Sequence, residues 1–113
     1  MALRLKNIDA RNIDKWLEGI GKFSKKLKIL LGDLLDSIYA PENPEINIRD
    51  YNVIIVVKKS LDEKTIDKIY ELSAEVCDKI NADFAIIPKV VVQNTQEAEE
   101  YVSILERIGA KVL

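Results

Sequence analysis

The feature that most constrains the fold is the run Val53 to Val57, in which five consecutive residues are all β-branched. Such residues favour strands, and an apolar run without alternation is typical of a central strand that is covered on both faces. A strand of this kind needs helices on both sides of its sheet. The stretch NVIIVVK therefore predicts an α/β sandwich with this strand inside a small sheet.

The residues before this strand predict two helices, a strand and a loop. Apolar residues recur at helical spacing in 8–20, at Ile13, Trp16, Leu17 and Ile20, and again in 22–33, at Phe23, Leu27, Leu30 and Leu31. We expect Gly19 and Gly21 to interrupt the helical pattern between them. The segment LLDSIYA, 34–40, predicts a strand, and the two prolines of PENPEINI, 41–48, predict a loop.

The residues after the strand predict two more helices and two more strands. A helix is expected over 60–80, with Ser60 and Glu63 as a capping box. The segment DFAIIP predicts a strand over 83–88 that stops or bends at Pro88, and KVVVQ, 89–93, continues it as a sheet edge. A final helix capped by Asn94 or Thr95 runs to Gly109, and a last strand is expected over 111–113.

This order defines the fold class that we expect, an α/β (α+β) fold with a small mixed β-sheet and helices packed on it. The chain forms a single domain, 1–113, in which an extra N-terminal helix within 1–21 precedes a core of 22–113. A ferredoxin-like sandwich is the alternative, and the two arrangements differ in where the strand 34–40 pairs.

Composition excludes several classes of function. The net charge of −2 argues against a protein held on nucleic acid by phosphate contacts. The chain has no histidine, which excludes His-based zinc sites and Ser-His-Asp triads, and we expect its single cysteine, Cys77, to be a core residue. There is no signal segment and no apolar run that could span a bilayer, so a cytoplasmic protein without a membrane partner is expected. The abundance of isoleucine, lysine and glutamate suits a thermophile.

Three polar residues at predicted strand ends suggest a metal site. Asp50 and Asn52 are two residues apart before the central strand, so their side chains point to the same face, and Asp83 begins the next predicted strand. Oxygen ligands that converge in this way can hold Mg²⁺ for phosphoryl or nucleotidyl transfer. The alternative is structural, because Asp and Asn before a strand are common turn residues.

Four segments of the chain carry a resemblance to a known family. They are LKILLGDLLDSIYA, RDYNVIIVV, NADFAII and LERIGAKVL, in that order. From Leu27 to the C-terminus the chain resembles the minimal nucleotidyltransferases, relatives of the DNA polymerase beta catalytic core. The resemblance implies a nucleotidyltransferase-like fold in a prokaryotic protein. It places Asp50, Asn52 and Asp83 at the first, second and third metal-binding positions.

The sequence departs from that family at two points. The family's Gly-Ser turn has no counterpart after Ser37-Ile38-Tyr39, and Asn52 offers a cation no negative charge. We therefore expect no bound metal or weakly bound Mg²⁺. The departures favour a degenerate, catalytically inactive member that acts through protein contacts.

The resemblance also implies the kind of partner, a small helical protein; a homodimer is the other expectation. The sheet edge 89–93 or the N-terminal helix with Trp16 could supply the contact surface, although Trp16 could equally pack that helix onto the sheet. Two alternatives remain open. One is an active Mg-dependent nucleotidyltransferase acting on a protein or small acceptor; the other is a module that binds a nucleoside triphosphate without turnover, with Lys58 and Lys59 near its phosphates.

Overall fold

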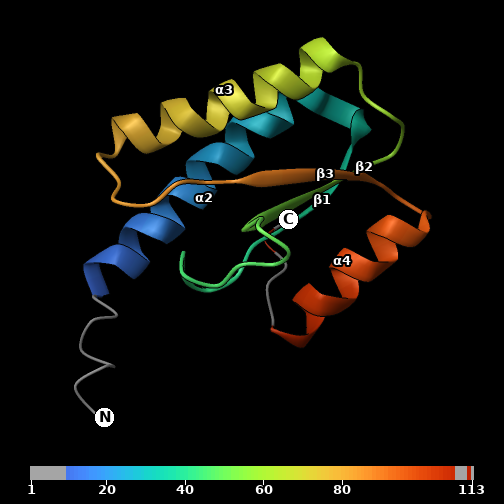
Figure 1. The fold of residues 1–113 in the computed structure, drawn as a ribbon. Helices are drawn as coiled ribbons and strands as arrows, with labels where there is room; N and C mark the ends of the chain where they lie inside the picture. Colours follow the sequence, from blue (N-terminus) through green and yellow to red (C-terminus); the bar gives the residue numbers. More distant parts are fainter. Residues whose placement is uncertain (1–9, 109–111, 113) are drawn as a thin grey trace.

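The computed structural model describes residues 10–108 and 112, which form a small α+β fold (Figure 1). Three helices pack on a three-stranded mixed sheet, so the expected fold class is confirmed. The elements in chain order are α2 (Ala10–Leu31), the 3-10 turn η1 (Gly32–Leu34), β1 (Leu35–Tyr39), β2 (Val53–Val57), α3 (Glu63–Lys79), β3 (Pro88–Val92) and α4 (Gln96–Arg107).

The strand β2 lies in the middle of the sheet, as its sequence predicts. The strand order is β1-β2-β3, with β1 antiparallel and β3 parallel to β2. All five residues of β2 are buried. Val53, Ile55 and Val57 belong to the core under α2 and α3, and Ile54 and Val56 belong to the core against α4. Figure 1 shows these helices on opposite sides of the sheet.

The helix α2 is continuous, so the expected interruption at Gly19 and Gly21 is wrong. Its buried stripe outweighs the cost of about 1 kcal/mol per helical glycine, because each large apolar side chain contributes about 1.5–3 kcal/mol on burial. The stripe consists of Trp16, Ile20, Phe23, Leu27 and Leu31. Leu17, which we expected in the stripe, is 57% exposed because it lies outside this face.

The two glycines differ in their surroundings. A Cβ built on Gly19 would lie 3.1 Å from Cδ1 of Ile80 and 3.7 Å from Cδ1 of Ile86, so this glycine lets the helix approach the end of α3 closely. A Cβ on Gly21 would meet no atom within 4 Å. Gly19 therefore serves packing, whereas Gly21 only weakens the helix.

This difference predicts opposite effects of substitution. Gly21→Ala should raise the free energy of unfolding by about 1 kcal/mol, because alanine loses less conformational entropy in a helix. Gly19→Leu should lower it by about 1–3 kcal/mol, because the larger side chain must displace Ile80. Urea denaturation of both variants measures the two changes. A loss of stability in Gly21→Ala would contradict a helix that is continuous through this position.

The strand β1 contains a bulge that the alternating pattern did not reveal. Its pairing with β2 shifts between Leu35, opposite Val57, and Ser37, opposite Val56. The extra residue, Asp36, reverses the alternation of side chains. Leu35 consequently packs in the same core as Ile38, on the side of α2 and α3.

The third strand begins at Pro88, whereas the sequence predicted that a strand would end there. Residues 83–87 are irregular, and the predicted edge segment is itself β3. Proline is compatible with the first position of a strand because it needs no backbone donor there. At the other end of the chain, Val112 donates its backbone N–H to the Ile38 carbonyl at 2.8 Å. Gly109, Lys111 and Leu113 lie outside the described residues.

The cap of α3 is Asp62, so the expected capping box at Ser60 and Glu63 is wrong. The Asp62 carboxylate accepts a hydrogen bond from the Thr65 backbone N–H at 2.8 Å. Thr95 caps α4 as predicted, and its hydroxyl accepts from the Ala98 N–H at 3.1 Å. None of the helices in residues 10–108 has the length and apolarity that crossing a bilayer requires.

The position of the α3 cap can be tested by pH and mutation. Hydrogen bonds from Thr65 hold the pKa of Asp62 below its ordinary value, since they favour the carboxylate. The cap therefore stabilises the protein above the carboxyl's unfolded pKa, and the contribution is lost as the pH falls through the folded pKa. Asp62→Ala should lower Tm at pH 7, and the difference from wild type should shrink as the pH falls through the folded pKa of the Asp62 carboxyl. Ser60→Ala is the matched control, and an equal effect of both substitutions on Tm would contradict the assignment.

Candidate functional site

Asn52, the second of the predicted metal ligands, is a buried structural residue at the start of β2. It is 2% exposed. Its Oδ1 accepts from the Ile87 backbone N–H at 2.6 Å, and its Nδ2 donates to the Ala85 carbonyl at 2.7 Å. The backbone N–H of Asn52 also bonds to the Ile87 carbonyl at 3.0 Å. Asn52 thus attaches the irregular segment 83–87 to the central strand where regular pairing has not yet begun.

Asp50 lies in a tight turn before β2, and it is exposed. Ile48 and Tyr51 close the turn with two backbone hydrogen bonds of 2.6 and 3.0 Å. Arg49 and Asp50 both have positive φ, at 51° and 76°, as the central residues of a type I′ turn do. Asp tolerates this conformation well, so turn chemistry alone explains its presence.

Arg49, the other turn residue, is strained at positive φ and is held by contacts to α4. Its Nη1 lies 3.2 Å from Oε2 of Glu100, and its guanidinium stacks over the ring of Tyr101 at 5.3 Å. The hydrogen bond to Glu100 raises the pKa of Arg49 above its already high value. These contacts join the turn before β2 to the helix α4.

Asp83, the third predicted ligand, is exposed in the bend after α3. It precedes Ala85, which Asn52 contacts, so the structure brings the segments of all three predicted residues to one end of the sheet. Within residues 10–108, no three His, Cys, Asp or Glu side chains form a group that could hold a metal ion. Any cation on Asn52 would compete with Ile87 for the same amide oxygen.

An acidic residue at position 52 tests whether this side chain stabilises the fold or binds a metal ion. Asn52→Asp restores the charge that the resemblance implies, but it replaces the Nδ2 donor with an oxygen that faces the Ala85 carbonyl. We expect a loss of about 1–3 kcal/mol in the free energy of unfolding, as for a buried hydrogen bond that is broken. Thermal denaturation with and without 10-fold excess Mg²⁺ measures it. Full recovery of Tm by Mg²⁺, absent in Asn52→Ala, would instead indicate a metal site.

Trp16 is fully buried, so it belongs to the core and not to a contact surface. Its Nε1 donates to the Pro41 carbonyl at 2.7 Å, and its ring meets Phe84 edge-to-face at 5.3 Å. The interpretation that Trp16 packs the N-terminal helix onto the rest of the fold is therefore confirmed.

The free edge of β3 is the second predicted contact surface. The Gln93 N–H donates to the Val57 carbonyl at 2.8 Å, and β3 is in parallel register with β2. Backbone groups alternate along a strand, so those of Val91 face β2 and those of Val90 and Val92 face outward. Among the described strands none pairs with this edge.

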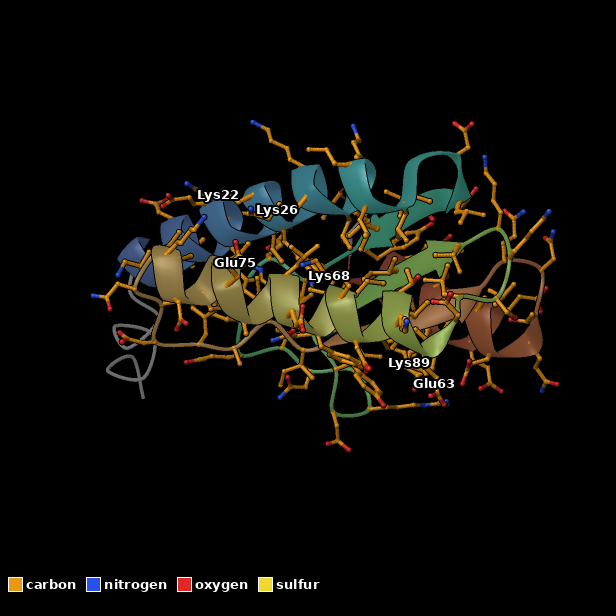
Figure 2. All side chains as sticks on the ribbon, turned by 90° about the horizontal axis from the view of Figure 1, so that it is seen from above. Lys22, Lys26, Glu63, Lys68, Glu75 and Lys89 are labelled. Atoms are coloured by element: carbon orange, nitrogen blue, oxygen red, sulfur yellow. The ribbon has the colours of Figure 1, made fainter. Side chains whose placement is uncertain are left out.

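Two pockets of about 260 Å³ each lie on opposite layers of the fold. One, between α2 and α3, is lined by Lys26, Ile29, Leu30, Lys68 and Leu72. Figure 2 shows Lys26, Lys68 and Glu75 on these two helices, and the Lys26 Nζ lies 3.7 Å from the Glu75 carboxylate. The positive charge of Lys26 on this layer is therefore partly neutralised.

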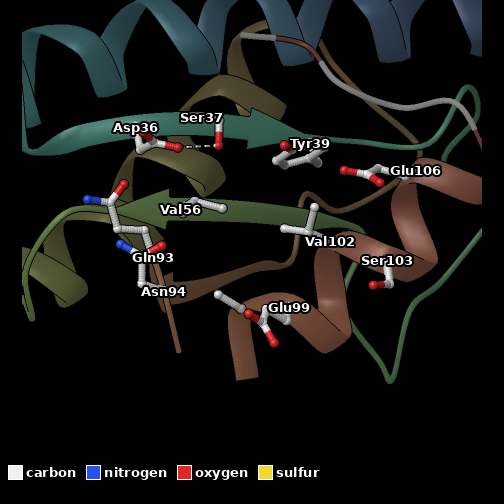
Figure 3. Close-up of a pocket in the computed structure, with 11 residues that line it drawn as sticks. Asp36, Ser37, Tyr39, Val56, Gln93, Asn94, Glu99, Val102, Ser103 and Glu106 are labelled. Carbon is white, nitrogen blue, oxygen red and sulfur yellow. Dashed lines mark hydrogen bonds between the residues drawn. The ribbon is translucent and has the colours of Figure 1, made fainter. Parts of the chain in front are cut away.

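The other pocket lies between β1 and α4 (Figure 3). Its three charged residues are the carboxylates Asp36, Glu99 and Glu106. Sequence reasoning missed this pocket because its residues come from β1, β2, the end of β3 and α4. The one signal in the sequence was the spacing of Glu99 and Glu106, which places them two helical turns apart on one face.

Comparisons with models of known protein families, with curated proteins and with solved structures gave no match. The resemblance to the minimal nucleotidyltransferases therefore stays a prediction, and the function is argued from the geometry of the chain.

Proposed function

We propose that the chain is a catalytically inactive, nucleotidyltransferase-like domain that binds another protein through the free edge of β3. One observation carries the first half of this proposal. Asn52 stands at the second metal position that the resemblance implies. Both polar atoms of its side chain form hydrogen bonds with backbone groups, of Ala85 and Ile87. A working metal site needs a carboxylate at this position that faces the ion.

The surroundings of Asn52 select an amide. The site offers one backbone acceptor, at Ala85, and one backbone donor, at Ile87, and the amide of Asn52 matches both, whereas an ionised carboxylate offers no donor. A carboxylate would set an oxygen against the Ala85 carbonyl in a buried place, at a cost comparable to a broken hydrogen bond. Asn52 is therefore suited to holding the segment 83–87 and poorly suited to neutralising phosphate charge.

The edge of β3 supports the second half of the proposal. An exposed strand edge pairs readily with an extended segment of another chain, because backbone groups supply the affinity. The backbone N–H and C=O groups of Val90 and Val92 face away from β2, whereas Pro88 has no N–H to donate. The partner that we propose is a small, mainly helical protein that contributes one extended segment to this edge.

Val90→Pro tests this surface. It removes one outward N–H and leaves the hydrogen bonds between β3 and β2 in place, since those come from the neighbouring residues. The matched control is Val90→Ala, which truncates the same side chain and keeps the N–H. Partners recovered with the tagged protein should be purified and titrated against both variants by calorimetry. We expect Val90→Pro to weaken binding by about tenfold relative to Val90→Ala, as loss of one hydrogen bond predicts.

Two outcomes would contradict the proposal. Equal affinities of the two Val90 variants would exclude the β3 edge as the contact. Mg²⁺-dependent binding of ATP that disappears in Asp50→Ala would show that the metal positions still serve nucleotide chemistry. Light scattering of the protein alone would detect self-association through the same edge.

A further inference from the structure

The helix α3 turns one flank towards the open edge of β3. On one face of the sheet, α2 contacts β1 and α3 contacts β3, so α3 is the helix nearer to that edge. Lys68 and Leu72 line the pocket between the two helices, and Figure 2 shows Lys68 on the side of α3 that faces α2. Tyr70 comes two residues after Lys68, which turns its side chain by about 200° around the helix. Tyr70 therefore lies on the opposite flank, away from α2 and on the side of the β3 edge.

Two more residues mark the same flank of α3. Ile66 precedes Tyr70 by four residues and Cys77 follows it by seven, so all three share one side of the helix. The Cys77 thiol lies beside the backbone of Ile86, in the segment that leads into β3. Tyr70 is 44% exposed and Ile66 is half-buried, so their apolar surface is open to a chain that pairs with this edge.

The side chains of β3 differ in burial between the two faces of the sheet. Val91, on the face covered by α4, is 1% exposed. Val90 and Val92 pack against the core under α2 and α3, yet both are only half-buried. No described strand lies beside them on their outer side. The unfilled apolar surface at this edge is therefore on the face of α3.

Pairing with β3 fixes where the side chains of an added strand point. A residue opposite Val90 or Val92 places its side chain on their face of the sheet, since directly paired residues share a face. Two positions of the added segment, separated by one residue, thus meet the valines and the outer flank of α3. The residue between them points to the other face, where the Lys89 Nζ lies 3.5 Å from the Glu97 carboxylate. An apolar side chain suits the first two positions and a polar one suits the third.

We propose that the segment bound at β3 carries large apolar side chains at these two positions, and that Tyr70 selects them. This inference rests on the proposed contact at the β3 edge and adds its specificity. Backbone hydrogen bonds at a strand edge supply affinity, whereas contacts of alternate side chains supply specificity. A tyrosine ring offers a large apolar contact at a low cost in conformational entropy. The partner is thus recognised by an extended segment in which apolar and polar residues alternate.

Two synthetic peptides of equal charge test this specificity. One alternates valine with lysine, and the other alternates serine with lysine. Calorimetric titration of the whole protein at physiological salt should show the valine peptide binding about tenfold more tightly, as burial of apolar side chains predicts. In Tyr70→Ala we expect this preference to fall severalfold, whereas Tyr70→Phe, which keeps the ring, should retain it.

The matched control is Ile29→Ala. Ile29 is 86% exposed on α2, so this variant also removes an exposed apolar side chain, but from the helix farther from β3. It should bind both peptides as the wild type does. Tm of Ile29→Ala and Tyr70→Ala should stay close to that of the wild type, because neither side chain is buried.

The specificity and the β3 contact fail in different ways. Equal affinity for the two peptides, with both weakened in Val90→Pro relative to Val90→Ala, would overturn the specificity and leave the contact intact. Absence of binding of either peptide would overturn both. A preference for valine that is unchanged in Tyr70→Ala, or reduced equally in Ile29→Ala, would show that Tyr70 does not select the segment.

Discussion

The burial of β2 on both faces is the constraint on which the rest of the structure depends. Side chains of Val53, Ile55 and Val57 require cover from α2 and α3, and those of Ile54 and Val56 require cover from α4. Loss of either helical layer would expose a fully apolar strand to water. Among the described strands, β2 lies in the middle of the sheet, between β1 and β3.

The sequence suggested Asn52 as a metal ligand and Trp16 as a contact residue. In the structure both side chains join segments that are distant along the chain. Asn52 holds the segment before β3, and Trp16 bonds to Pro41 and packs against Phe84. Buried polar groups need partners, so an amide and an indole N–H inside a small fold are usually fully occupied. Among the described residues, the open edge of β3 and the acidic pocket beside α4 are not used to join segments in this way.

The candidate sites were predictable to different degrees. The position of Asp50 and Asn52 before a central strand followed from the sequence, because an apolar run marks where the strand begins. The hydrogen bonds of Asn52 did not follow, because they depend on residues more than thirty positions later. The pocket with Tyr39 could not be predicted, since it needs the bulge at Asp36 and the placement of α4 against β1 and β2.

By itself the sequence determined the fold class, the central place of β2 and the buried faces of most helices, because apolar periodicity reports which side of an element must leave water. Only the tertiary structure decided that α2 continues through Gly19 and Gly21, that β3 begins at Pro88 and that Asp62 caps α3. At the first two of these places local propensity is weak or ambiguous, and contacts with distant segments supply the larger free energy. At the α3 cap the sequence offers two acceptable residues, and the geometry of the connection from β2 selects between them.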